Sequence, residues 1–157
     1  MKRRPFYLVL LLLLSCNEAS QNNNESQEAE NSIINNNKQI EQWYKDKKAD
    51  SLIIHMADKV IQLPPNRSPL IGRDSVKKYW EQLFQFGNID FSIRTQEVKA
   101  NGTLAVELGK YSFKFNPNPN SPIPVIVDSG NYVCCWQKID GSWKLVWDAP
   151  VSTVPIH

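Results

Sequence analysis

Metal-ligating and redox residues are scarce in this chain of 157 residues, which contains two histidines and three cysteines. Only His55 is internal, because His157 is the last residue, and one histidine cannot build a multi-histidine metal site. The sequence also lacks a glycine-rich phosphate loop, a Gly-x-Ser-x-Gly elbow and a Cys-x-x-Cys pair. We therefore expect no metal and no cofactor.

A long apolar run occurs only near the start, at residues 6–14, after three basic residues. The run is too short to span a bilayer as a helix, and Ser15 precedes a cut site of the kind found in secretory signal peptides. Cys16, directly after that site, resembles the lipidated cysteine of the bacterial lipobox. The resemblance implies a lipoprotein signal peptide over residues 1–15 and a lipid such as palmitate on Cys16. The alternative is an ordinary signal peptide with an incidental cysteine.

This anchor would set both the location and the charge of the mature protein. The domain would lie outside the cytoplasm, held at a membrane of the cell envelope, which we expect to be the outer membrane or the cell surface. Removal of residues 1–15 would take three of the 18 basic residues and leave 15 against 16 acidic ones. A chain so close to neutral is not expected to bind nucleic acid.

Residues 17–37 are mostly Asn, Gln, Ser and Glu, with almost no large apolar side chain before Ile33. Such a composition buries too little surface to offset the entropy of ordering the chain. The sequence therefore predicts a lipidated cysteine and flexible tether over residues 16–37, followed by one domain over residues 38–157.

Apolar residues recur with helical spacing in two parts of this domain. Ile40, Trp43 and Tyr44 predict a helix from Lys38, and Asp50 begins a second short helical run. After Gly72, one more amphipathic helix is predicted by five residues at i, i+3, i+4, i+7 and i+8: Val76, Tyr79, Trp80, Leu83 and Phe84.

After Gly87 the apolar period becomes two, which is typical of strands, and the turn signals are Asn101-Gly102 and Asp140-Gly141. Counting outward from the second turn places Trp136 opposite Leu145, and Cys134 opposite Trp147, on one aromatic face. Helices followed by a long antiparallel run predict an α+β domain whose curved sheet packs on the helices.

Several short motifs follow one another in the domain: Ala57-Asp58, Gly72-Arg73-Asp74-Ser75-Val76, Asp140-Gly141, Trp143-Lys144-Leu145 and Asp148. Their order and spacing resemble the SnoaL-like branch of the nuclear transport factor 2-like superfamily. The resemblance covers residues 38 to 153 and implies a cone-shaped, cystatin-like fold with N-terminal helices, a strongly curved antiparallel β-sheet and a pocket inside. Members include isomerases, dehydratases and polyketide cyclases as well as ligand-binding and dimerising domains, so the fold does not choose a function.

Catalytic candidates are few. Pro64 stands where ketosteroid isomerase-like members carry their base, and Ile40 stands near the place of their helix tyrosine. His55 and Asp148 remain as candidate acids or bases, each with a structural alternative as a surface histidine or a hydrogen-bonded carboxylate. Cys134 and Cys135 are adjacent, so on a strand they point to opposite faces, and we expect two shielded thiols.

The sequence favours an anchored lipoprotein whose domain binds a small, largely apolar molecule. The ligand-binding candidates are the large side chains Trp43, Met56, Tyr79, Tyr111, Trp136 and Trp147. Two alternatives stay open. One is an enzyme of the cyclase, dehydratase or isomerase type that uses His55 or Asp148, and the other is a dimerising protein-interaction module, such as a homodimer, with its sheet face covered by the partner.

Overall fold

The computed structural model describes residues 15–155, with side chains from residue 24 onward, so the predicted signal peptide lies almost wholly outside the described residues. The helices are α1 (Ser15–Lys45), α2 (Ala49–Leu52) and α3 (Arg73–Phe86), with a 3₁₀ turn at Ile53–His55. The strands are β1 (Met56–Gln62), β2 (Leu70–Ile71), β3 (Gly87–Asn101), β4 (Leu104–Pro117), β5 (Ile126–Ile139) and β6 (Ser142–Ser152). None of the described helices is long and apolar enough to cross a membrane.

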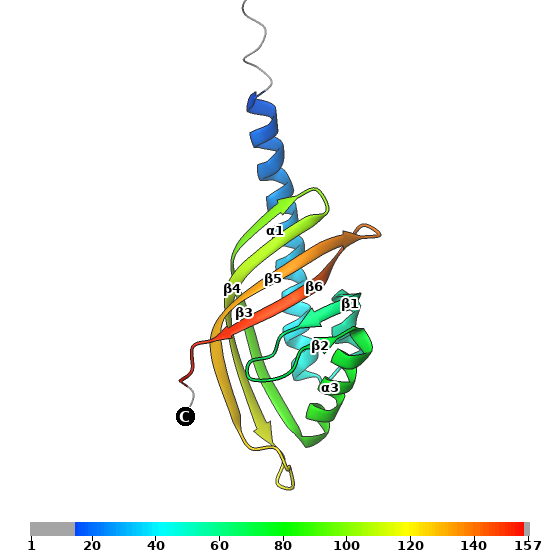
Figure 1. Ribbon diagram of the computed structural model, residues 1–157, viewed down its shortest axis with the longest axis vertical. Coiled ribbons are helices and arrows are strands. Elements are labelled where there is room, and N and C mark those ends of the chain that lie inside the picture. Colours follow the sequence, from blue (N-terminus) through cyan, green and yellow to red (C-terminus); the bar gives the residue numbers. More distant parts are fainter. Residues whose placement is uncertain (1–14, 156–157) are drawn as a thin grey trace, which may run out of the picture.

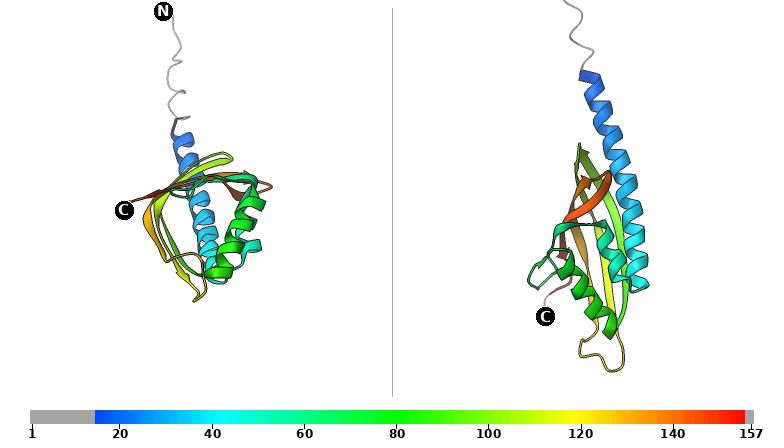
Figure 2. Two further views of the ribbon diagram at one scale, coloured as in Figure 1. Left: turned by 60° about the horizontal axis from the view of Figure 1, so that its bottom comes forward. Right: turned by 90° about the vertical axis from the view of Figure 1, so that its right-hand side faces the viewer.

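The six strands form one sheet in the order β2-β1-β6-β5-β4-β3. Neighbouring strands are antiparallel except β1 and β6, which run parallel. The sheet curls around α1 and α3, as the views along and across the molecule show (Figures 1 and 2). The predicted α+β architecture, with helices on the concave face of a strongly curved sheet, is confirmed.

Helix α3 forms where its apolar spacing predicts it. Val76, Leu83 and Phe84 are buried, while Tyr79 and Trp80 are half-buried on the side that faces the interior of the cone. Gly72 precedes the helix with a φ of 83°, a left-handed conformation that glycine adopts at little cost. The helix therefore starts at the predicted motif and brings two aromatic rings to the concave side of the sheet.

The prediction of a flexible tether up to residue 37 is wrong for its C-terminal part. Helix α1 includes this segment, and Ala29 and Ile33 are fully buried while Asn37 is 6% exposed. These residues lie four positions apart, so they share the face of α1 that packs on β3. The domain therefore begins well before Lys38, and Ile33 is the one large apolar residue among the three that mark the buried face.

The predicted register of the last hairpin holds near the turn and then fails at a bulge. Ile139 pairs with Ser142 and Trp136 pairs with Leu145, as expected, but Cys135 then pairs with Trp147. Val146 is thus an extra residue in β6, and every side chain beyond it changes face. Trp147 turns outward and is 56% exposed, whereas Asp148 turns inward, opposite Cys134.

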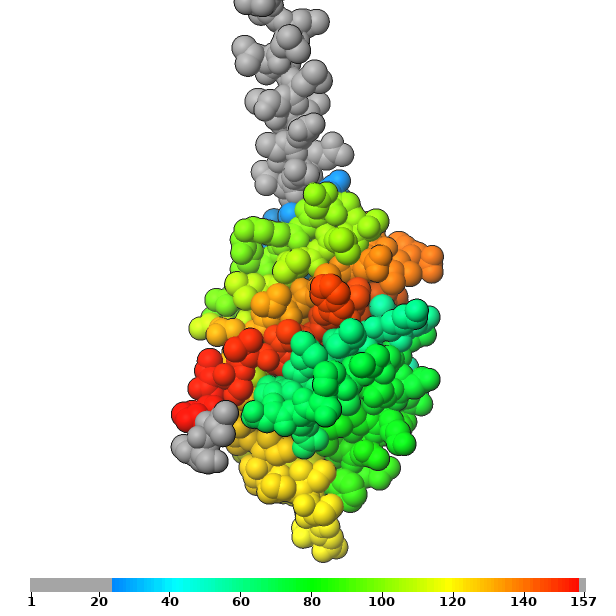
Figure 3. Space-filling view, in the orientation of Figure 1, coloured from blue at the N-terminus to red at the C-terminus, as the bar shows by residue number. Residues whose placement is uncertain are grey.

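The outer face of the sheet carries an apolar patch, which we call the outer patch. It spans β4, β5 and β6, three strands that lie side by side on the surface of the molecule (Figure 3). The large apolar side chains in it are exposed by 40% or more: Leu104, Val106, Leu108, Val133 and Trp147. This face has no covering element in the described part of the chain.

Candidate functional site

A cavity of about 430 Å³ lies between the helices α1 and α3 and the concave face of the sheet. Its walls are largely aromatic and include Tyr44, Tyr79, Trp80, Phe91, Tyr111, Phe113, Tyr132 and Trp136. The lining residues that are exposed to solvent mark the mouth: Asn66, Arg67, Val127, Val154 and Pro155. The size and the aromatic lining fit a small organic molecule.

Gln62, Cys134 and Asp148 line the cavity and lie in one row that crosses the sheet, together with Val98 and Glu107, which are not part of the cavity lining. The strand registers align Val98 on β3, Glu107 on β4, Cys134 on β5, Asp148 on β6 and Gln62 on β1. Partners in neighbouring strands point to the same face, so all five side chains are directed to the concave side. Two carboxylates therefore lie in one row, with only Cys134 between them.

Glu107 is 1% exposed and accepts four hydrogen bonds. Its Oε1 accepts from Asn37 Nδ2, Thr95 Oγ1 and the Tyr132 hydroxyl, each at 2.7 Å, and its Oε2 accepts from Trp136 Nε1 at 2.9 Å. These donors come from α1, β3 and β5, so the carboxylate on β4 joins four elements of the fold. Burial and the neighbouring Glu107 charge raise the pKa of Tyr132 well above its usual value, which keeps this phenol neutral.

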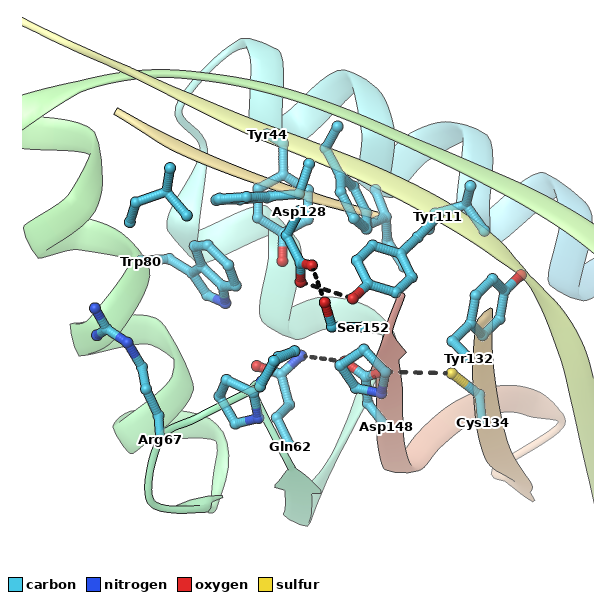
Figure 4. Close-up of a pocket in the computed structure, with 18 of the residues that line it drawn as sticks. Tyr44, Gln62, Arg67, Trp80, Tyr111, Asp128, Tyr132, Cys134, Asp148 and Ser152 are labelled. Atoms are coloured by element: carbon cyan, nitrogen blue, oxygen red, sulfur yellow. Dashed lines mark hydrogen bonds between the residues drawn. The ribbon is translucent and has the colours of Figure 1, made fainter. Parts of the chain in front are cut away.

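Asp148 has fewer and weaker partners. Gln62 Nε2 donates to Oδ2 at 3.0 Å, and the Cys134 thiol donates to Oδ1 at 3.6 Å, as Figure 4 shows. Withdrawal from bulk water raises the pKa of Asp148 from 3.8 to about 6; the Cys134 and Gln62 hydrogen bonds oppose this shift, and the Glu107 charge adds to it. The group therefore gains and loses a proton near neutral pH, inside the cavity.

A second polar cluster lies further along the strands β4, β5 and β6, on the same concave face as the row. The Tyr111 hydroxyl donates to Asp128 Oδ2 at 2.7 Å, and Ser152 Oγ donates to Asp128 Oδ1 (Figure 4). Burial, followed by the hydrogen bond to Asp128, raises the pKa of Tyr111 above 10, so this phenol stays protonated. Asp128 thus holds two hydroxyl groups in place beside the open space.

Four of the six predicted ligand-binding residues line the cavity: Met56, Tyr79, Tyr111 and Trp136. Trp147 does not, because the bulge at Val146 turns it to the outer patch. Trp43 does not either, since it lies at the far side of α1, where its ring stacks on His55 with centroids 5.1 Å apart. Whether the four lining residues contact a ligand stays a prediction.

The two predicted catalytic candidates separate clearly in space. His55 is outside the cavity, where its ring nitrogen lies 3.1 Å from Gln39 Oε1. Burial, with a smaller effect of the Lys144 charge, lowers the pKa of His55, so the ring is neutral at pH 7. Asp148, in contrast, lines the cavity, which leaves it as the one candidate acid or base of this pair that can reach a bound molecule.

The sequence alone did not identify Gln62, Glu107, Asp128 and Cys134 as site residues. In β4 the apolar residues Leu104, Val106 and Leu108 lie on the outer face, so Glu107 between them points to the concave side. Tyr111, Phe113 and Phe115 have the opposite parity and lie inside. This change of parity within one strand was the available signal that Glu107 faces inward.

Solved structures with a similar fold were found for most of the chain. A conserved protein from Planctomyces limnophilus shares 24% identity, with a TM-score of 0.72 over 83% of this chain and 99% of that one. A ketosteroid isomerase-like protein from Erwinia carotovora atroseptica shares 14%, with a TM-score of 0.66 over 79% and 95%. A nuclear transport factor 2-like superfamily protein from Salmonella enterica serovar Typhimurium shares 14%, with a TM-score of 0.66 over 82% and 95%.

The chain has a nuclear transport factor 2-like fold. No protein-family model matches the sequence, and no curated protein matches it either. Structural similarity at these low identities establishes the nuclear transport factor 2-like fold. It does not establish an activity, because one fold hosts many functions.

Proposed function

We propose that this protein is a lipid-anchored protein of the cell envelope whose nuclear transport factor 2-like domain binds a small, largely apolar molecule. The observation that carries the binding proposal is the cavity of about 430 Å³ with its aromatic walls and two polar clusters. Apolar walls supply affinity by burying ligand surface, and a few fixed polar groups supply orientation. The anchor rests on Cys16 and the sequence before it.

The binding proposal is tested by asking what co-purifies with the full chain. Ile126 lines the cavity, so Ile126→Trp should fill part of it, whereas Val125 is 57% exposed and outside the lining. Mass spectrometry should find a small molecule with the wild-type protein and with Val125→Trp, and should find it depleted in Ile126→Trp. Equal recovery from all three proteins, or none from any, would contradict the proposal.

The anchor is tested separately in cells that express the full chain. Labelled palmitate should enter the wild-type protein and place it in the membrane fraction. Cys16→Ser should abolish the label and leave an unprocessed or soluble protein. Label that still enters this variant would show that Cys16 is not the lipidated residue.

A second candidate function is proton transfer by Asp148, because its pKa of about 6 and its place in the cavity suit a general acid or base. One of the similar structures is described as ketosteroid isomerase-like, so a β,γ-unsaturated ketosteroid is a reasonable first substrate. Turnover by the wild-type protein that disappears in Asp148→Asn would support an enzyme. Equal rates in both proteins would exclude this role for Asp148.

The outer patch favours a homodimer as a third candidate. Several exposed apolar side chains on three adjacent strands form a surface that monomers rarely leave uncovered. Lys99 and Glu97, which form an ion pair at 3.1 Å, lie on the neighbouring strand β3 and border the patch. Sedimentation should show a dimer for the wild-type protein and a monomer for Val106→Lys; a monomeric wild type would contradict this.

A further inference from the structure

Within the part of the chain that the structure describes, no Lys or Arg forms an ion pair with the carboxylates at the cavity. Asp128 and Asp148 line the cavity, and Glu107 lies two strands away from Asp148 in the same row, beyond Cys134. The ion pairs in the described part of the chain involve none of these three carboxylates. Hydrogen bonds from amides, hydroxyls and an indole satisfy Glu107 and Asp128, but they do not neutralise the charge.

Asp148 is the least satisfied of the three groups. An ionised carboxylate offers about four acceptor positions, and Asp148 receives one amide hydrogen bond and one weak thiol contact. The close-up view shows its carboxyl group between Gln62 and Cys134, at the edge of the space enclosed by the aromatic rings (Figure 4). A donor on a ligand can therefore complete its hydrogen bonding.

Arg67 does not supply the missing charge. Among the described lining residues it is the one Lys or Arg, and its side chain is exposed at the mouth. Its guanidinium lies over the Tyr79 ring, 5.4 Å from the centroid, instead of pairing with a carboxylate. The positive charge thus stays at the entrance and the interior remains negative.

The aromatic walls add a second feature that suits a positive ligand. Tyr44 packs against Trp80 and against Phe91 with ring centroids 4.7 Å apart in both pairs, and Phe113 borders Trp80 and Phe91. All four line the cavity. Aromatic faces attract organic cations, and this attraction increases when the site is withdrawn from water.

From these observations we propose that the cavity selects a small organic cation, an amine with an aromatic or aliphatic body. Its ammonium group donates to Asp148 and its body lies against the rings of Tyr44, Trp80 and Phe91. This inference rests on the proposed binding function and specifies the chemical class of the ligand. It also identifies Asp148 as the residue that sets the charge preference.

The test uses three compounds that share one ring system and differ in charge: 1-naphthylmethylamine, 1-naphthalenemethanol and 1-naphthylacetate. Calorimetric titration of the full chain at about pH 7.5 should show the amine binding about tenfold or more tighter than the alcohol, since a charge-assisted hydrogen bond is roughly twice as strong as a neutral one. The carboxylate should bind most weakly, because Asp148 and Asp128 repel it.

The variants connect this preference to one residue. Asp148→Asn keeps the size of the side chain and removes its charge, so the amine should bind it no better than the alcohol does. Asp90→Asn is the matched control, because Asp90 is exposed on β3 and accepts a hydrogen bond from Asn116 at 2.9 Å. This control should keep the wild-type preference for the amine.

The dependence on pH is a further readout. The groups that face Asp148 are Gln62 from β1, Cys134 from β5, Glu107 from β4, and the phenols of Tyr44 and Tyr111. The pKa values of the thiol and both phenols are raised, so these groups stay neutral. Amine affinity should therefore rise as Asp148 ionises near pH 6 and level off above about pH 7, while alcohol affinity should not change in this way.

The outcomes also distinguish the cation preference from the proposed binding of a small, largely apolar molecule. An alcohol that binds as tightly as the amine, or a carboxylate that binds more tightly, would overturn the cation preference and leave binding of an apolar molecule intact. If none of the three compounds binds the wild-type protein, both the cation preference and the proposed binding function are contradicted.

Discussion

Glu107 and Asp148 are two carboxylates in the same row of the sheet, and they have opposite surroundings. Glu107 is 1% exposed and accepts four hydrogen bonds, three of them at 2.7 Å. Asp148 faces the cavity with one amide donor and one weak thiol donor. A carboxylate that is fully satisfied holds the fold together, whereas one left partly unsatisfied beside open space is available to a ligand.

The largest expected loss of stability comes from substitution of Glu107, the carboxylate with four hydrogen bonds. Glu107→Gln replaces one acceptor oxygen by an NH₂ group that faces donors, so buried hydrogen bonds are lost on α1, β3 or β5. Because unsatisfied buried polar groups are costly, we expect a loss of about 3–5 kcal/mol in the free energy of unfolding, measured with urea.

The matched control is Glu97→Gln, an exposed position on β3 that should change stability by less than about 0.5 kcal/mol. Equal stability of the two variants would show that the hydrogen bonds to Glu107 do not stabilise the packing of α1, β3, β4 and β5.

The next largest effect on stability tests whether the N-terminal part of α1 packs on the sheet. Ile33 is fully buried one turn before Asn37, which donates to Glu107, whereas the adjacent Ile34 is half-buried. Ile33→Ala should cost about 2–4 kcal/mol and Ile34→Ala clearly less. An unchanged melting temperature for Ile33→Ala would support the prediction that this segment is a flexible tether.

Substitution of Asp148, the partly unsatisfied carboxylate, should raise the free energy of unfolding, whereas substitution of Glu107 lowers it. The pKa of Asp148 is higher in the folded state than in the unfolded chain, so the folded protein binds the proton more strongly. This contribution stabilises the fold at low pH and is lost as the pH rises from about 4 through 6. Asp148→Asn should therefore be more stable than wild type by about 2–3 kcal/mol at pH 7.5, with the difference vanishing near pH 4.

Urea unfolding across this pH range measures the difference directly, and Asp90→Asn should show no such change with pH. A variant Asp148→Asn that is less stable than wild type at pH 7.5 would place Asp148 in the same structural class as Glu107.

The smallest effect concerns the two tryptophans that the sequence placed on one face. Trp136 is 1% exposed and donates to Glu107, whereas Trp147 is 56% exposed. Trp147→Phe should change the unfolding free energy by less than about 0.5 kcal/mol, and Trp136→Phe should cost more because it removes a buried donor. Equal losses would mean that Trp147 packs in the interior.

The fold was predictable because its signals are local. The spacing of Val76, Leu83 and Phe84 defines α3, and Asp140-Gly141 sets the start of the last hairpin. The bulge at Val146 has no such signal, since any apolar residue fits there, and it exchanged the faces of Trp147 and Asp148. Glu107 was missed because its satisfaction depends on donors up to 70 residues away in the chain.

The most direct measurement is a carbon-13 NMR titration of the Asp148 side-chain carboxyl group in the full chain, assigned by comparison with Asp148→Asn. The account predicts a midpoint near pH 6 without ligand and a lower midpoint when 1-naphthylmethylamine is bound, because a cation favours the ionised form. A midpoint at the ordinary value near 4, unchanged by the amine, would show that Asp148 is solvated and would contradict its role as the ligand-facing carboxylate.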